Sequence, residues 1–318
     1  MQETHNFIVL GGSGAGLGIA HSFLKHIEPE LAKLDKTYHP TLPGVGHAPF
    51  GRRALRAHRR WIQAVRFLAG GGPTGVEITG EIGHFLNGST GWFSSRSSNP
   101  KAKVTVVTKG DKLLPVLNKS RALWAETLLN RVGVDVVYNV SVVSSTTDAD
   151  GKTTVDLSNG EQWTADVYIP AWGVTPNSEY VPANFKNDQG YIKTNEATLR
   201  ADAAGPRVYV AGDVGDYSRR GFHNLYSAIP VLAANIKRDL LAAAASDSLD
   251  TKPEGLGRSF TRNSSETQAV PIGPAGVGAV NGWGLPSFLT WLLKGRNYMI
   301  GNITVTVNGD MVKRDNTG

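Results

Sequence analysis

The sequence predicts an α/β fold, because short apolar runs alternate with glycine-rich turns and helical patterns. Two runs, residues 7–10 and 65–69, each end in glycines and lead directly into residues with helical spacing. Strand, glycine turn and helix in this order form the first half of a βαβ unit, so parallel strands are expected. Between residues 134 and 169, three further runs are separated by turn signals at 148–151 and 158–160, which predicts a three-stranded meander.

The central glycine turn has the spacing Gly70-x-Gly72-x-x-Gly75. In this pattern the first glycine makes a tight turn, the second lets the backbone approach a pyrophosphate, and the third permits close packing of helix on strand. The helix that follows would offer free N–H groups to phosphate oxygens. A glycine-rich turn with no ligand is the alternative.

An earlier glycine turn has the weaker register Gly11-x-Ser13-x-x-Gly16. Serine replaces the middle glycine, so the approach of a ligand to the backbone is more crowded. The position between a strand and a helix still favours a nucleotide-binding turn over a purely structural one. Together the two turns predict two Rossmann-like dinucleotide-binding domains.

The remaining pattern completes this architecture. Strands are expected at 103–108, at 207–211 before Gly212-Asp213 and at 303–307. Helices are expected at 54–64, 121–131, 225–245 and 288–293. Elsewhere in residues 27–60 the sequence shows no clear strand.

Composition excludes several kinds of chemistry. The chain has 318 residues and no cysteine, which rules out a redox dithiol, a thiolate nucleophile and a disulfide framework. The eight histidines show no metal-binding spacing, so no metal site is predicted. The net charge of +6 suits phosphate-bearing ligands. The basic cluster at 52–60 is interpreted as a solvated helix face, so no specific nucleic-acid binding is expected.

Without a signal sequence or an apolar run of ~18 residues, a cytoplasmic location is expected.

Several segments together resemble the flavoproteins with two dinucleotide-binding domains. They are residues 70–77 with Gly80-Glu81, 171–177, 208–214 and 270–274. Within that group the chain is most similar to the apoptosis-inducing factor 2 (ferroptosis suppressor) branch, fungal members especially, and more distantly to type II NADH dehydrogenases. The resemblance implies an FAD-binding domain (1–61 and 167–250), an NAD(P)H-binding domain inserted in it (62–166), and a small α+β C-terminal segment (251–318).

The resemblance also assigns residues to the flavin. Gly11, Ser13 and Gly16 would lie at the FAD pyrophosphate. Asp213, with Gly212 leaving room beside it, would accept hydrogen bonds from the ribityl hydroxyls. Asp213 has an alternative role as the N-cap of the following segment.

A second set of residues is assigned to the nicotinamide nucleotide. Gly70, Gly72 and Gly75 would hold the NAD(P)H pyrophosphate. Glu77 would lie near the nicotinamide end, or instead act as a partner of the helix dipole. Gly173 resembles the glycine at the crossing between the two domains.

Three departures from the family stand out. Trp172 occupies the position of a small threonine, so a tighter domain crossing is expected. The acid that binds the ribose of NAD is replaced by Thr108-Lys109, where the lysine would meet the 2′-phosphate of NADPH or simply face solvent. Residues 17–69 are too few for a complete βαβαβ half with an inserted meander, so the FAD domain is expected to be abridged.

These observations predict an FAD-dependent NAD(P)H oxidoreductase that passes a hydride to flavin and electrons to a quinone-like acceptor. The cofactors carry the chemistry, so no catalytic side chain is assigned. The alternative is a nucleotide-binding protein that senses redox state or binds a partner without efficient turnover. The aromatic, leucine-rich segment 283–299 predicts either peripheral membrane contact or a core helix capped by cations.

Overall fold

The structure is a computed structural model that describes residues 4–8, 27, 29–30, 33, 37–41, 65–88, 100, 102–173, 175–205, 207–217, 221, 224–246, 257–262 and 264–310. The chain divides into two compact units. The central unit comprises residues 50–174 and 264–299, and the flanking unit comprises residues 1–49, 175–263 and 300–318.

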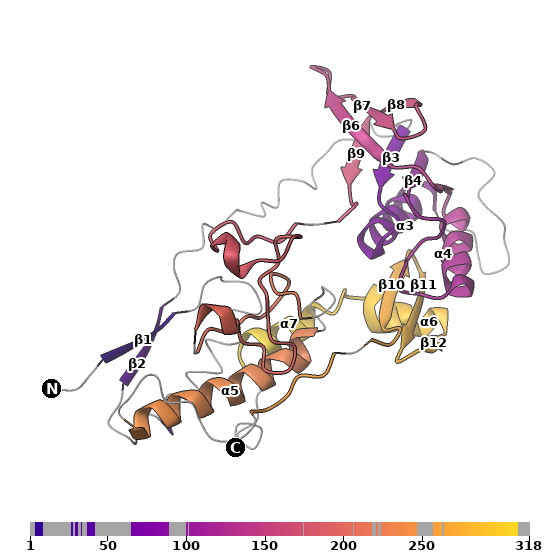
Figure 1. Ribbon diagram of the computed structural model, residues 1–318. Helices are drawn as coiled ribbons and strands as arrows, with labels where there is room; N and C mark the ends of the chain where they lie inside the picture. The colour runs from indigo at the N-terminus through magenta and orange to yellow at the C-terminus, as the bar shows by residue number, and fades with distance from the viewer. Residues whose placement is uncertain are drawn as a thin grey trace. The chain divides into compact units, whose positions relative to one another are not determined.

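A four-stranded parallel sheet forms the base of the central unit (Figure 1). Its order is β5-β4-β3-β9, with bounds Val134–Val137, Lys103–Val107, Val65–Ala69 and Val167–Pro170. The chain builds the sheet outward from β3 to β5 and then returns to the other side of β3 with β9. The direction of winding therefore changes between β3 and β9. In open α/β sheets, ligands bind outside the carboxyl ends of the strands at such a change.

Two helices and a second sheet cover the parallel sheet. Helix α3 (Pro73–Asn87) follows β3 and helix α4 (Lys119–Arg131) follows β4. The antiparallel sheet β10-β11-β12 (Gln268–Ile272, Ala275–Val280 and Trp283–Leu285) packs on both helices, as the yellow strands of Figure 1 show. One apolar core joins all three layers and includes Val76, Val106, Leu129, Val134, Ile272 and Val277.

Close packing between the layers depends on a glycine and on a capped helix end. A Cβ atom on Gly80 of α3 would lie 2.8 Å from Cγ2 of Ile272, so only glycine lets the helix approach β10 this closely. At the start of α4, the Asn118 side chain accepts the Arg121 N–H at 3.0 Å and caps the helix. Glu266 accepts hydrogen bonds from both Asn118 N–H and the Arg121 guanidinium, which ties the second sheet to α4.

The predicted meander is confirmed, but its outer runs are each divided between two sheets. Strands β6 (Val142–Thr147), β7 (Thr153–Leu157) and β8 (Gln162–Ala165) form an antiparallel sheet. Glycines with positive φ, Gly151 (81°) and Gly160 (87°), occupy its two turns. The run 134–143 is divided at Asn139, whose φ is +57°, so that its first part joins the parallel sheet as β5.

The flanking unit combines one long helix with a short parallel strand pair. Helix α5 (Leu225–Ser246) confirms the prediction, and its buried face packs with Ile27, Leu199, Tyr217 and Phe260. Strands β1 (Thr4–Ile8) and β2 (Thr37–Thr41) pair in parallel. The interpretation that residues 27–60 contain no strand is therefore wrong. The run 37–41 contains Pro40 and lacks apolar alternation, so its strand character was not visible in the pattern.

The strand expected at 207–211 is also wrong as a regular element. In the described residues this stretch makes one isolated bridge, between Arg200 and Tyr209. A strand needs a continuous hydrogen-bonding neighbour, and β1 pairs only with β2 among those residues.

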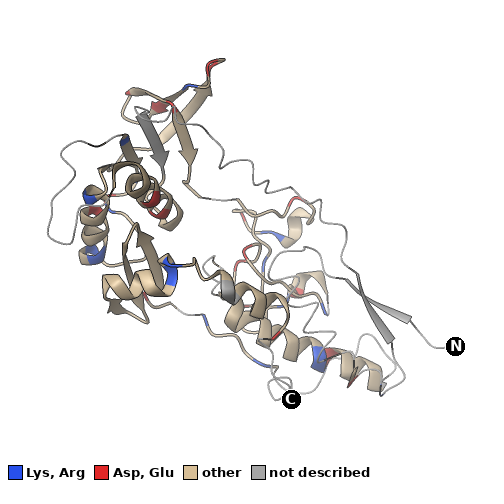
Figure 2. Cartoon of the chain, turned by 180° about the vertical axis from the view of Figure 1, so that it is seen from behind, with Lys and Arg blue, Asp and Glu red and all other residues tan. Residues whose placement is uncertain are grey.

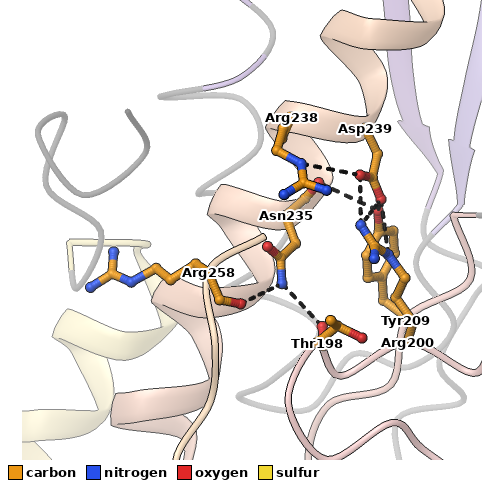
Figure 3. Close-up of polar contacts among 7 residues, drawn as sticks. All are labelled: Thr198, Arg200, Tyr209, Asn235, Arg238, Asp239 and Arg258. Atoms are coloured by element: carbon orange, nitrogen blue, oxygen red, sulfur yellow. Dashed lines mark hydrogen bonds and ion pairs between the residues drawn. The ribbon is translucent and has the colours of Figure 1, made fainter. Parts of the chain in front are cut away.

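A buried polar network fixes α5 to the loops around it (Figure 3). The Arg200 guanidinium donates to Asp239 through Nε at 3.0 Å and through Nη2 at 2.6 Å. The Tyr209 hydroxyl donates to the same carboxylate, and Asp239 is 3% exposed. Asn235, one turn earlier, donates to the carbonyls of Thr198 and Arg258.

Residues 251–318 contribute to both units rather than standing apart. The helix predicted at 288–293 is present as α6 (Ser287–Thr290) and the π-helical turn η5 (Trp291–Gly295). The strand predicted at 303–307 is wrong, because this stretch lies in helix α7 (Ile300–Val307). Its alternating Ile, Thr and Val residues favour a strand, but strand preference depends on a neighbouring strand.

In the described part of the chain, no helix has the length and apolar character that a membrane span requires.

Candidate dinucleotide-binding site

The carboxyl ends of β3, β4 and β9 lie side by side at one edge of the parallel sheet. Ala69 is in register with Val107 of β4 and with Pro170 of β9. The Gly70 N–H donates to Val107 O at 2.8 Å, which extends the pairing by one residue beyond β3. The glycine turn therefore begins at the point where the winding of the sheet changes direction.

Gly70 is required by the close approach of two backbone segments. Its φ is +124°, a conformation that residues with side chains rarely adopt. A Cβ atom there would lie 2.0 Å from Ala171 O. Backbone packing alone therefore explains why residue 70 is a glycine, whether or not a ligand binds there.

Gly71 has a similar role against β4, and the sequence analysis did not single it out. A Cβ atom on Gly71 would lie 2.5 Å from Thr108 Oγ1. The Leu114 N–H donates to Gly71 O at 2.8 Å, and Leu113 and Leu114 are both fully buried. The segment after β4 therefore holds the glycine turn in place from one side.

Gly72 differs from its two neighbours because no contact among the described residues requires a glycine there. It is the N-cap of α3, with φ −77° and ψ 179°, which any residue adopts. A Cβ atom there would meet no atom of the described residues within 4 Å. Open space in front of a helix N-terminus fits a phosphate group, because the first N–H groups of a helix have no partner inside the helix. Pro73, at the first helical position, lacks an N–H group, but the N–H at that position would have no partner inside the helix in any case.

Gly75 lies in the first turn of α3 and is buried. Its carbonyl accepts the Thr79 hydroxyl at 2.5 Å, and Thr79 is also fully buried. A small residue here suits the packing of the helix in the core, as the glycine spacing predicts.

Glu77 forms an ion pair with the C-terminal part of the central unit. Lys294 Nζ lies 2.5 Å from Glu77 Oε1 and also donates to Ala269 O at 3.1 Å. Burial raises the pKa of the Glu77 carboxyl, and the Lys294 ammonium opposes this shift only in part. Glu77 is the fifth residue of α3, and the first turn of that helix contains no acid, so the interpretation as a dipole partner is wrong. Its position near the nicotinamide stays a prediction.

A second contact joins the same two segments. The Tyr298 hydroxyl is hydrogen-bonded to Glu81, and burial together with that carboxylate raises the pKa of the Tyr298 phenol. Glu77 and Glu81 lie one turn apart on the same face of α3. Tyr298 lies beyond η5, in a turn where its φ is +50°, so the C-terminal segment is fixed to α3 both within η5 and after it.

Thr108 and Lys109 lie at the end of β4 in different environments. Thr108 is 8% exposed, and its side chain packs under Gly71. Lys109 is exposed. Of these two residues, only Lys109 has a side chain that a ligand could contact at this edge, and its role stays a prediction.

Gly173 and Trp172 follow β9 and lie on the surface. Gly173 has φ +132°, and a Cβ atom there would meet nothing within 4 Å. Trp172 is 60% exposed, and its ring lies 5.9 Å from that of Tyr168.

The residues assigned to FAD belong to the flanking unit or lie outside the described residues. Asp213 is exposed, and its Oδ1 accepts the Gly221 N–H at 2.9 Å. Gly212 has φ +84° and donates its N–H to the Tyr217 hydroxyl. Gly11, Ser13, Gly16 and the basic cluster at 52–60 lie outside the described residues.

Sequence comparison identifies the family to which this geometry belongs. The profile of the pyridine nucleotide-disulphide oxidoreductases matches residues 35–231, which is more than half of the 318 residues. The chain belongs to that family. Membership implies that it uses FAD and NAD(P)H.

Individual relatives of this chain are mostly longer proteins. "Oxidoreductase phnG" of Penicillium herquei is 44% identical over 241 residues, which cover 73% of this chain and 57% of the relative. The type II NADH:quinone oxidoreductase of Haemophilus influenzae is 27% identical over 169 residues, or 53% of this chain and 35% of that protein. Among solved structures, the flavoprotein disulfide reductase RclA of Escherichia coli has a TM-score of 0.42 at 19% identity, covering 60% of this chain and 37% of RclA. The chain thus spans less than three fifths of each.

Proposed function

We propose that this chain is an FAD-dependent NAD(P)H oxidoreductase with a quinone-like electron acceptor, most similar to the apoptosis-inducing factor 2 branch. The observation that carries the proposal is the open space at Gly72, at the N-terminus of α3 and at the change in sheet winding. The two cofactors supply the redox chemistry, which is hydride donation by NAD(P)H and electron transfer through the flavin.

The residues of the central unit bind and orient the nicotinamide nucleotide. Backbone N–H groups at the start of α3 bind the pyrophosphate, and Gly70 and Gly71 hold that helix end against the sheet. Lys109, exposed at the end of β4, interacts with the 2′-phosphate of NADPH. The quinone-like acceptor is proposed by analogy with the Haemophilus influenzae relative, which is an NADH:quinone oxidoreductase.

An anaerobic titration tests this function. The purified chain is kept in excess FAD and titrated with NADPH or NADH while the visible flavin band is followed, with FAD in the absence of protein as the control. We expect the nucleotide to bleach the band and a soluble benzoquinone to restore it. A band that persists with both nucleotides would contradict the proposal.

A second function is favoured by the flanking unit, where β1 pairs only with β2 among the described residues and 207–211 forms no strand. That organisation suits a nucleotide-binding protein that senses redox state or binds a partner without efficient turnover. The titration separates the two functions, because such a protein would bind NAD(P)H, measured by nucleotide fluorescence, without any bleaching of flavin.

A further inference from the structure

Trp172 places a large aromatic side chain at the surface beside the glycine turn. Its side chain is 60% exposed. A Cβ atom on Gly70 would lie 3.0 Å from the backbone nitrogen of Trp172, so the two backbones touch. Two residues earlier, Pro170 ends β9 in register with Ala69 of β3. Trp172 therefore lies at the same carboxyl edge of the sheet as the glycine turn.

The indole of Trp172 is held from one side. Alternate residues of a strand point to opposite faces of the sheet. Ile169 and Ala171 pack against the core that includes α3, whereas Tyr168 packs against the core of the meander. The rings of Tyr168 and Trp172 lie 5.9 Å apart with 39° between their planes, a distance at which aromatic rings attract each other. Tyr168 thus orients the indole, while most of the Trp172 side chain stays exposed.

The strand order determines which half of a dinucleotide would reach Trp172. In this kind of fold the pyrophosphate lies at the glycine turn, and the adenosine ribose lies at the end of the next strand along the chain. That strand is β4, which pairs with one side of β3 and is followed by Thr108 and Lys109. Trp172 follows β9, which pairs with the other side of β3. The nicotinamide half would therefore extend toward Trp172.

The surface at Trp172 suits a flat ring better than a phosphate. Residues 167–173 contain no charged side chain, and β9 carries neither blue nor red in Figure 2. A Cβ atom on Gly173 would meet no atom of the described residues within 4 Å, so the space after the tryptophan is open. The face of an indole attracts other aromatic rings, and it attracts cations more strongly than any other side-chain ring does. Oxidised nicotinamide is both a flat ring and a cation.

We propose that Trp172 stacks on the nicotinamide ring and binds the oxidised, positively charged form more tightly than the reduced form. The inference rests on the proposed function, because it needs the nucleotide to be bound at the glycine turn. It adds a preference between the two redox forms. NADP⁺ would then compete with NADPH for the site, so the spent nucleotide would slow its own replacement.

Calorimetry on the full chain without added flavin tests the proposal with three probes. They are NADP⁺, NADPH and adenosine 2′,5′-bisphosphate, which has the adenine half of NADP⁺ and lacks the nicotinamide. Trp172→Ala should weaken NADP⁺ binding by roughly tenfold, the loss expected when an indole no longer faces a cationic ring. The same variant should weaken NADPH binding less and leave binding of the bisphosphate unchanged.

Two further variants separate stacking from other effects of the substitution. Trp172→Phe keeps an aromatic ring and should recover part of the lost affinity for NADP⁺, since indole is the stronger partner of a cation. Trp283 on β12 is 82% exposed outside the parallel sheet, so Trp283→Ala should bind all three probes like the wild type. Circular dichroism and urea unfolding check that each variant is folded.

Four results would overturn the inference. A wild type that binds none of the three probes would overturn the proposed function as well. A wild type that binds all three, with unchanged affinities in Trp172→Ala, would overturn this inference alone. An equal loss for all three probes would show that Trp172 only packs against the rest of the chain. An equal loss for NADP⁺ and NADPH would remove the preference for the oxidised ring.

Discussion

At the scale of single residues, three consecutive glycines are present for different physical reasons. Gly70 and Gly71 lack side chains because Ala171 and Thr108 occupy the space that a Cβ atom needs. Gly72 has an ordinary backbone conformation and open space in front of it. No contact among the described residues requires a glycine at the last of the three, and this agrees with the prediction that a ligand approaches it.

This difference gives the first prediction. Gly72→Val should lower the free energy of unfolding by no more than about 1 kcal/mol, because the site is unstrained and open and only the preference of an N-cap for glycine over valine is lost. It should nonetheless abolish NAD(P)H binding by filling the space of the pyrophosphate. Isothermal titration calorimetry and urea unfolding measure the two effects. Gly70→Val, by contrast, should destabilise by more than about 2 kcal/mol, because it combines a disallowed φ with a clash. Unchanged affinity in Gly72→Val would exclude this site.

Coenzyme choice is a second property set by one residue. The end of β4 has no acid at Thr108, which is buried, and an exposed cation at Lys109. NADPH should therefore bind at least as well as NADH. Lys109→Glu should shift the ratio of the two dissociation constants toward NADH by roughly tenfold, the effect of one charged contact of ~1.4 kcal/mol. Lys112→Glu is a suitable control, because Lys112 instead donates to Leu117 O. A wild type that strongly prefers NADH would contradict the assignment.

At the residue scale, the sequence predicted the local conformation of the glycine turn, whereas the ligand of that turn stays a prediction. The spacing of Gly70, Gly72 and Gly75 reflects a turn and the helix that follows it, and both are determined by adjacent residues. The partner of Glu77 was not predictable in this way. Lys294 is 217 residues away in the sequence, and nothing near either residue indicates that the chain brings them together.

At the scale of elements, the C-terminal segment is held on α3 by paired contacts of buried groups. Glu77 and Lys294 have side chains only 14% and 25% exposed. Each charge in such a pair is stabilised mainly by the other, so removal of one partner costs more than the pair contributes as a whole.

The pH dependence of a Lys294 variant follows from this. Burial already raises the pKa of Glu77, and Lys294→Met would raise it further by removing the opposing ammonium. A raised folded-state pKa gives stability that is present below the unfolded pKa and is lost as pH rises through the folded one. The variant should therefore lose about 1–3 kcal/mol more, relative to the wild type, at pH ~8 than at pH ~4.

Urea unfolding at several pH values measures this loss. The double variant Glu77→Gln/Lys294→Met lacks both charges and should recover much of the stability, with little pH dependence. A single variant whose deficit does not change with pH would show that Glu77 is not buried with its charge.

The network on α5 makes a parallel prediction in the flanking unit. Asp239→Leu would leave the Arg200 guanidinium, 19% exposed, without its carboxylate, and should cost about 3 kcal/mol. Tyr209→Phe removes one hydrogen bond and should cost about 1 kcal/mol. Thermal unfolding followed by circular dichroism measures both. Arg200→Met/Asp239→Leu should be more stable than Asp239→Leu alone, and the contrary order would contradict the pairing.

Whether a segment forms a helix or a strand was predictable from sequence where its periodic pattern is long. It was not predictable where a neighbouring element of the fold determines the conformation. Helices α4 and α5 and the central strands follow from local periodicity. The apolar run 134–143 is one stretch in sequence, yet its halves join different sheets around Asn139. Likewise α7 and β2 have sequences that their own preferences do not explain, since tertiary context overrides propensity in short segments.

At the scale of the whole molecule, the two predicted cofactor sites differ in how completely the described residues build them. The central unit has a parallel sheet, a glycine turn and an open helix N-terminus in one place. In the flanking unit, the described residues assigned to FAD are Gly212 and Asp213, and the strand expected before them is not formed. The central unit thus fits its nucleotide better than the flanking unit fits FAD.

Flavin retention is the consequence that tests this difference. FAD affinity comes from contacts along the whole dinucleotide, and one oxygen of Asp213 already accepts the Gly221 N–H. The acid for the adenosine ribose would follow the second strand, and residues 42–60 after β2 contain no acid. Losing one or two charge-assisted contacts of ~1.5–3 kcal/mol each weakens binding by roughly one to four decades. We therefore expect the chain to purify with little flavin and to regain only weak NAD(P)H oxidation when FAD is added in excess.

Asp213→Ala should weaken that recovery further. Asp216→Ala is the matched control, because the Asp216 carboxylate instead accepts the Thr194 N–H. A yellow protein whose near-stoichiometric FAD survives dialysis would show that residues 27–60 complete the site after all.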